Sequence, residues 1–104
     1  MPKRILEEVV KNGGKLESCS FSKTTKSMDA GFRFNDERSR EGALDAACKM
    51  RVEIQAELRK KKRPLVRVTV ARKGTNTLCV AIAGTTLRDL KSLSEYLKTL
   101  ESKQ

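Results

Sequence analysis

The apolar residues of this chain change their spacing several times, and each change falls at a cluster of Gly, Pro, Asn, Ser or Thr. Spacings of three and four place side chains along one face of a helix, whereas alternation places them on one face of a strand. The spacings predict the order α-ββ-α-ββ-α, with helices at about 2–11, 36–60 and 85–101 and strands at about 15–23, 28–34, 65–71 and 77–83. We therefore expect an α+β fold, a four-stranded antiparallel sheet with its helices packed mainly on one face.

The segment around 36–60 is the longest predicted element, and it carries an unbroken helical stripe. Its apolar residues recur at spacings of four, three, four and four: Ala43, Ala47, Met50, Ile54 and Leu58. Six charged residues are predicted to lie on the opposite, solvent-facing side: Arg40, Glu41, Asp45, Lys49, Glu53 and Glu57. This division is typical of a helix that lies on a core.

Two pairs of alternating segments predict two β-hairpins. In the second, Val66, Val68 and Val70 are expected to meet Leu78, Val80 and Ile82 across a turn that contains Gly74 and Asn76. In the first, one face of the second strand carries Met28, Ala30, Phe32 and Phe34. Alternation in the strand before it groups Leu16 with Ser18 and Ser20, and Glu17 with Cys19 and Phe21.

Three features fit more than one packing arrangement. The short helix at 2–11 could cover a sheet edge or the remaining face of the sheet. The residues of that face in the second hairpin are small enough for another surface to approach closely: Thr69, Cys79, Ala81 and Ala83. The last helix carries a leucine seam, Leu87, Leu90, Leu93, Leu97 and Leu100, whose spacing fits the core, which we favour, or the interface of a homodimer.

Positive charge is concentrated in one stretch of the chain. The 104 residues include 23 Lys and Arg against 13 Asp and Glu, a net charge of +10, and residues 59–73 supply eight cations and no acid. The predicted binding residues are these cations and the turn asparagine: Arg59, Lys60, Lys61, Lys62, Arg63, Arg67, Arg72, Lys73 and Asn76. Cations near a helix C-terminus complement its dipole. Five in succession repel one another, which favours an anionic partner.

The spacing of these cations favours a nucleic-acid backbone. A strand rises about 3.3 Å per residue, so Pro64 and Arg72 are expected to lie about 25 Å apart, separating a basic hairpin base from a basic tip. Each cation placed on a phosphate releases condensed counterions. Single strands are bound by stacking on exposed aromatic rings, of which the chain has few, so a duplex of DNA or RNA is favoured. Arg33, Lys23 and Lys26 could extend the footprint.

Two other functions fit the same charge. The protein could be an adaptor or inhibitor that docks its basic surface on an acidic protein partner. It could also be associated with the ribosome, where small basic domains are common.

Catalysis is not expected. The chain has no His, which excludes imidazole as a base or a metal ligand. Its carboxylates occur singly rather than in the converging groups that bind Mg²⁺. We expect no cofactor, no metal and no small-molecule substrate. Cys19, Cys48 and Cys79 lie far apart in the sequence and are expected to be reduced, buried apolar residues.

The chain also lacks the marks of a membrane or secreted protein. No run approaches the roughly 20 apolar residues of a membrane helix, and residues 1–10 include Lys3, Arg4, Glu7 and Glu8 rather than an apolar signal core. We therefore expect a cytosolic protein, away from membranes, in which residues 1–104 form a single domain.

Overall fold

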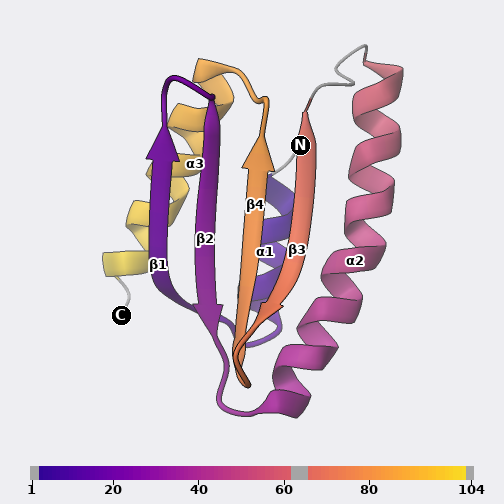
Figure 1. Ribbon diagram of the computed structural model, residues 1–104, viewed down its shortest axis with the longest axis vertical. Helices are drawn as coiled ribbons and strands as arrows, with labels where there is room; N and C mark the ends of the chain where they lie inside the picture. Colours follow the sequence, from indigo (N-terminus) through magenta and orange to yellow (C-terminus); the bar gives the residue numbers. More distant parts are fainter. Residues whose placement is uncertain (1–2, 62–65, 103–104) are drawn as a thin grey trace.

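The computed structural model describes residues 3–61 and 66–102. It confirms the predicted order of elements, α-ββ-α-ββ-α (Figure 1). The helices are α1 (Lys3–Lys11), α2 (Glu37–Lys60) and α3 (Leu87–Ser102), and the strands are β1 (Lys15–Ser22), β2 (Ser27–Arg33), β3 (Arg67–Lys73) and β4 (Thr77–Ala83).

The four strands form one antiparallel sheet in the order β1-β2-β4-β3. The two hairpins are therefore joined along β2 and β4, and β1 and β3 are the edge strands. Ile82 on β4 lies opposite Met28 on one side and Val68 on the other. Val80 lies opposite Val70. Val68 and Val70 thus meet residues of the predicted set, whereas Leu78 lies opposite Arg72 and Val66 precedes the paired strand.

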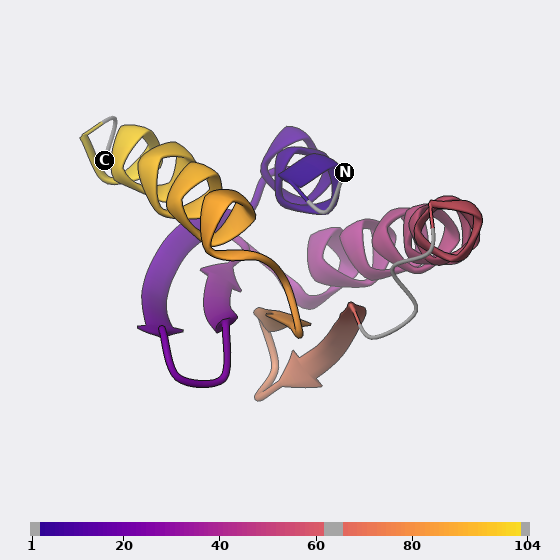
Figure 2. The same ribbon diagram turned by 90° about the horizontal axis from the view of Figure 1, so that it is seen from above.

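All three helices lie on one face of the sheet, with α1 between α2 and α3 (Figure 2). The expectation that the first helix covers a sheet edge or the remaining face is wrong. Its Ile5, Leu6 and Val9 side chains are completely buried in the same core that α2 and α3 cover. No helix or strand among residues 3–61 and 66–102 covers the other side of the sheet, which we call the uncovered face.

The leucine seam of α3 belongs to the core of the protomer. Leu90, Leu93, Leu97 and Leu100 are buried against the helix-covered face of the sheet. Leu87, at the start of the helix, is 56% exposed. Because the seam is used inside one chain, it is not the face on which a second copy would pack.

A β-bulge changes the alternation predicted for β1. The register shifts between Leu16, which lies opposite Phe32, and Ser18, which lies opposite Gly31. A bulge adds one residue to a strand and so reverses the facing of the residues before it. Leu16 is buried toward the helices, and Ser18 is exposed on the uncovered face. Grouping Leu16 with Ser18 was therefore wrong.

The end of α1 determines where β1 begins. Gly13 adopts a positive φ of 100°, a conformation that glycine accepts at little cost. The Gly13 N–H donates to the Val10 carbonyl at 3.0 Å, and the Gly14 N–H donates to the Val9 carbonyl at 3.1 Å. This pair of bonds is a Schellman motif, which satisfies the last carbonyls of the helix and turns the chain into Lys15.

Candidate nucleic-acid interface

The structure divides the predicted basic stretch between the two ends of β3. Arg59, Lys60 and Lys61 are exposed at the C-terminal end of α2, beside the start of β3 at Arg67 (Figure 1). The β3–β4 turn, with Arg72, Lys73 and Asn76, lies at the other end of the sheet, near the start of α2. Lys62 and Arg63 fall outside the described residues.

The strand register shows which side chains share the uncovered face. Across β1, β2, β4 and β3, its rows are Lys15, Arg33, Thr77 and Lys73; then Ser18, Gly31, Cys79 and Ala71; then Ser20, Asp29, Ala81 and Thr69. A further row contains Ala83 and Arg67. The face therefore has three cations at one end, Arg67 at the other, and small side chains between, with Asp29 as the one acid of these rows.

The middle of the uncovered face is hollowed. Ser18, Asp29, Gly31 and Cys79, with others, line a shallow depression of about 290 Å³, to which Lys73 also contributes. A Cβ atom on Gly31 would lie 2.8 Å from the Ser18 Oγ, so a larger residue at this position would require the Ser18 side chain to move. Small side chains here allow a ligand to come close to the backbone of the sheet.

A second depression lies between α2 and the edge strand β3. Arg51, Gln55 and Arg59 are spaced four residues apart and so share one face of α2. Together with Arg67, Val68 and Thr69 of β3 they line a groove of about 280 Å³, which we call the α2–β3 groove.

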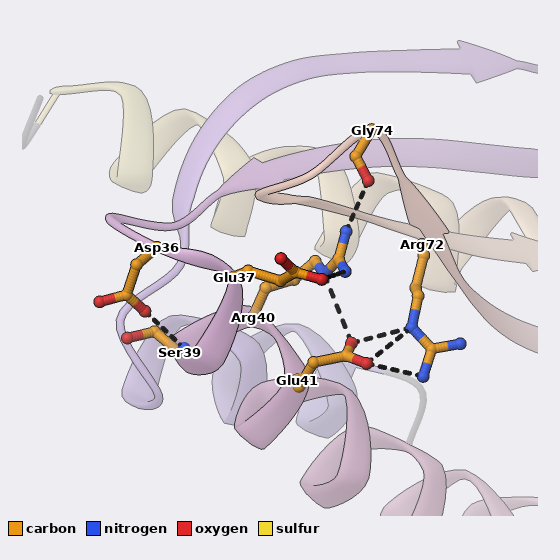
Figure 3. A network of polar contacts seen from close by, with 7 residues as sticks. All are labelled: Asp36, Glu37, Ser39, Arg40, Glu41, Arg72 and Gly74. Atoms are coloured by element: carbon orange, nitrogen blue, oxygen red, sulfur yellow. Dashed lines mark hydrogen bonds and ion pairs between the residues drawn. The ribbon is translucent and has the colours of Figure 1, made fainter.

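Arg40 holds the β3–β4 turn against α2 (Figure 3). It was predicted on the solvent side of the helix, but only 3% of it is exposed. Its Nη1 donates to the Gly74 carbonyl at 2.7 Å, and its Nε lies 3.4 Å from Glu41 Oε2. The prediction was wrong because the turn, far away in the sequence, packs over the first turns of the helix.

Arg72 is directed toward α2 and is paired with an acid of the same chain (Figure 3). Its Nε donates to both Glu41 carboxylate oxygens at 2.9 Å, and its Nη2 lies 2.8 Å from Oε1. The pair raises the pKa of Arg72 and lowers the pKa of Glu41. Among the predicted binding residues, Arg72 thus orients the hairpin, while Lys73, one residue later, faces the uncovered side.

Two acids near the start of α2 are expected to make the stability of the folded protein depend on pH. The Ser39 N–H donates to Asp36 Oδ1 at 2.7 Å, and this hydrogen bond lowers the pKa of Asp36. The pair with Arg72 lowers the pKa of Glu41 in the same way. Both groups release protons more readily in the folded state, so their stabilisation is complete above their ordinary pKa values, about 4. It is lost as the pH falls through the lowered folded values. Urea unfolding between about pH 3 and 6 should show this decline.

The control for this prediction is the double variant Asp36→Asn, Glu41→Gln. It should be less stable than the parent at neutral pH, and its stability should change less steeply in acid. A decline of equal steepness in both proteins would contradict the assignment to these two carboxylates.

Asn76 and the cysteines lie in settings that the sequence did not indicate. The Asn76 carbonyl accepts a hydrogen bond from the Phe34 N–H at 2.8 Å, which ties the turn to the end of β2.

Cys19 and Cys48 are exposed, and Cys79 is partly exposed on the uncovered face, so the prediction that all three are buried was wrong. Partial burial and the nearby Glu101 carboxylate raise the pKa of the Cys19 thiol.

Comparison with known proteins assigns no function to this surface. No family model, curated protein or solved structure matches this chain. Within residues 3–61 and 66–102, no helix has both the length and the apolar character needed to cross a membrane. In the same part of the chain, no three or more Cys, Asp or Glu side chains are grouped so that they could hold a metal ion.

Sequence reasoning missed two cations of this surface, Arg51 and Lys15. The spacing of four between Arg51, Gln55 and Arg59 was a usable signal, because it places all three on one side of a helix. Lys15 had no such signal. It joins Arg33 and Lys73 only through the pairing of all four strands.

Proposed function

We propose that this protein binds duplex nucleic acid, without catalysis, through the uncovered face of its sheet and the basic groups at both ends of that face. The observation that carries the proposal is the distribution of charge. Lys15, Arg33 and Lys73 lie at one end, and Arg67, next to the basic end of α2, lies at the other. Arg67 and Lys73 are six positions apart on β3, which is about 20 Å along a strand.

This arrangement suits a polyanion whose charges form two rows. Phosphate contacts at both ends would fix the position of a duplex on the protein. The major groove of B-DNA, about 12 Å wide, admits two strands, so two neighbouring strands of this four-stranded sheet could enter it. The small residues between the cations, such as Gly31 and Ala81, leave room for that approach.

The positions of the aromatic residues favour a duplex over a single strand. Phe32 and Phe34 are buried in the core. Phe21 lines a groove with residues of α3, and Tyr96 lies on α3 with Lys3 Nζ 5.2 Å from its ring centroid. The chain has no further aromatic residue, so its uncovered face offers no ring for base stacking, the usual means of holding single strands.

Ala81→Glu tests the proposal. Ala81 is partly exposed near the centre of the uncovered face, opposite Asp29 and Thr69. A second carboxylate there should weaken binding of a labelled 20-base-pair duplex by about tenfold or more, since a tenfold change needs only about 1.4 kcal/mol of added repulsion. Fluorescence anisotropy with DNA, RNA and single-stranded probes measures this effect and shows which polymer is preferred.

The matched control is Ser92→Glu, which adds the same charge at an exposed position on α3, on the other side of the sheet. It should reduce affinity far less than Ala81→Glu. Circular dichroism of both variants checks the fold. Wild-type protein that binds none of the probes, or equal losses in the two variants, would refute the proposed surface.

A further inference from the structure

The α2–β3 groove concentrates positive charge, and among the described residues that line it there is no acid. Arg51 and Arg59 reach it from α2, and Arg67 reaches it from β3. None of the three side chains forms an ion pair or hydrogen bond within residues 3–61 and 66–102, whereas the side chains of Arg40 and Arg72, at the other end of α2, are paired with Glu41.

Folding accounts for only one of these three arginines. A cation in the last turn of a helix complements the dipole, which explains Arg59. Arg51 lies two turns earlier, where the dipole has little effect, and Arg67 is on a strand. Three guanidinium groups on one small groove repel one another, so the arrangement favours an anion that all three can contact.

Gln55 holds the groove in shape. Its Nε2 donates to the Val66 carbonyl at 3.0 Å, and its Oε1 accepts from the Val68 N–H at 3.1 Å. One side chain thus satisfies two backbone groups at the start of the free edge of β3 and fixes α2 beside that strand. The two elements that carry the arginines are therefore positioned before any ligand binds, which lowers the entropic cost of binding.

The groove is continuous with the uncovered face. Arg67 and Thr69 line the groove and also belong to the rows of that face. α2 runs alongside the β3 edge in both views (Figures 1 and 2). A duplex on the uncovered face would therefore bring one of its backbones to the groove.

We propose that the α2–β3 groove binds one phosphate group of the nucleic-acid backbone between Arg51, Arg59 and Arg67. This inference rests on the proposed function and identifies one phosphate-binding site of the proposed duplex interface. The planar guanidinium group suits the task because it can donate two parallel hydrogen bonds to phosphate oxygens.

Arg51→Gln is the test, because Arg51 lies outside the contiguous basic stretch and the change keeps a polar side chain. It should weaken binding of a 20-base-pair duplex by about tenfold, and the slope of log affinity against log salt should become shallower by about 0.9, the value for one phosphate contact. The matched control, Arg88→Gln, removes the same charge from an exposed position on α3 and should leave the slope unchanged.

The outcomes separate the two proposals. Wild-type protein that binds no duplex would refute the proposed function. If the wild-type protein binds the duplex and Arg51→Gln keeps the parent affinity and salt slope, only the proposed phosphate-binding site is refuted. In NMR spectra, the Arg51 Nε–H signal should shift when a short duplex is added at constant salt, and much less when inorganic phosphate is added at equal phosphate concentration. Equal shifts with both would indicate a site for free phosphate, against the proposal.

Discussion

Duplex affinity should fall by about a thousandfold when the salt concentration rises from about 50 to about 200 mM. Each phosphate neutralised by a cation releases condensed counterions, and salt opposes that release with a slope of about −0.9 per contact. The uncovered face and the α2–β3 groove together present six cations: Lys15, Arg33, Arg51, Arg59, Arg67 and Lys73. Anisotropy titrations at four or more salt concentrations give the slope directly.

A pair of double variants tests whether this slope belongs to the proposed surface. Arg33→Gln with Lys73→Gln removes two cations from one row of the uncovered face and should make the slope shallower by about 1.8, twice the value for one contact. Arg88→Gln with Lys91→Gln removes the same residue types from exposed positions on α3. Equal slopes in the two double variants would mean that net charge, rather than this surface, governs binding.

The order of elements could be predicted because burial imposes a period on the sequence. The stripe from Ala43 to Leu58 places its members on the side of α2 that packs on the sheet. Val68 and Val70 of β3 meet Ile82 and Val80 of β4 on the predicted apolar face, because a slip by one residue would expose the whole set. Local spacing carries this information, so no long-range contact had to be known.

Features that depend on long-range packing were not predictable in this way. The amphipathic α1 could have covered either side of the sheet, and its own sequence does not indicate that it lies between α2 and α3. Arg40 looks like any charged residue at the start of a helix until the turn at Gly74 is placed over it. The bulge that separates Leu16 from Ser18 also leaves no clear mark in the spacing.

The candidate site was predicted as a stretch of sequence, and the structure redistributes it over surfaces. Adjacent residues of a strand face opposite sides. Arg72 is therefore directed to Glu41 and α2, while Lys73 faces the uncovered side. A contiguous charge count cannot separate such neighbours. It also cannot join Lys15 to Lys73, because their association requires the register of three strand pairs.

Phe32→Ala should cause the largest loss of stability of any change proposed for this protein. Phe32 lies on the central strand β2, between Leu16 and Leu78, and is completely buried. Truncating such a ring removes its buried surface and leaves a cavity, which costs about 3–5 kcal/mol. A domain of this size is stable by only about 5–15 kcal/mol, so urea unfolding should show a much lower midpoint.

Phe21→Ala is the matched comparison, because the same ring is removed from the edge strand β1, where it is 37% exposed. The loss should be about 1 kcal/mol, typical of a substitution that creates no closed cavity. Phe21 lines a groove with Leu87 and Leu90, away from the uncovered face, so duplex binding should stay at the parent level. Equal stability losses at the two positions would contradict the assignment of Phe32 to the core centre. Weakened duplex binding by a stable Phe21→Ala would place the nucleic acid on the helical side of the sheet instead.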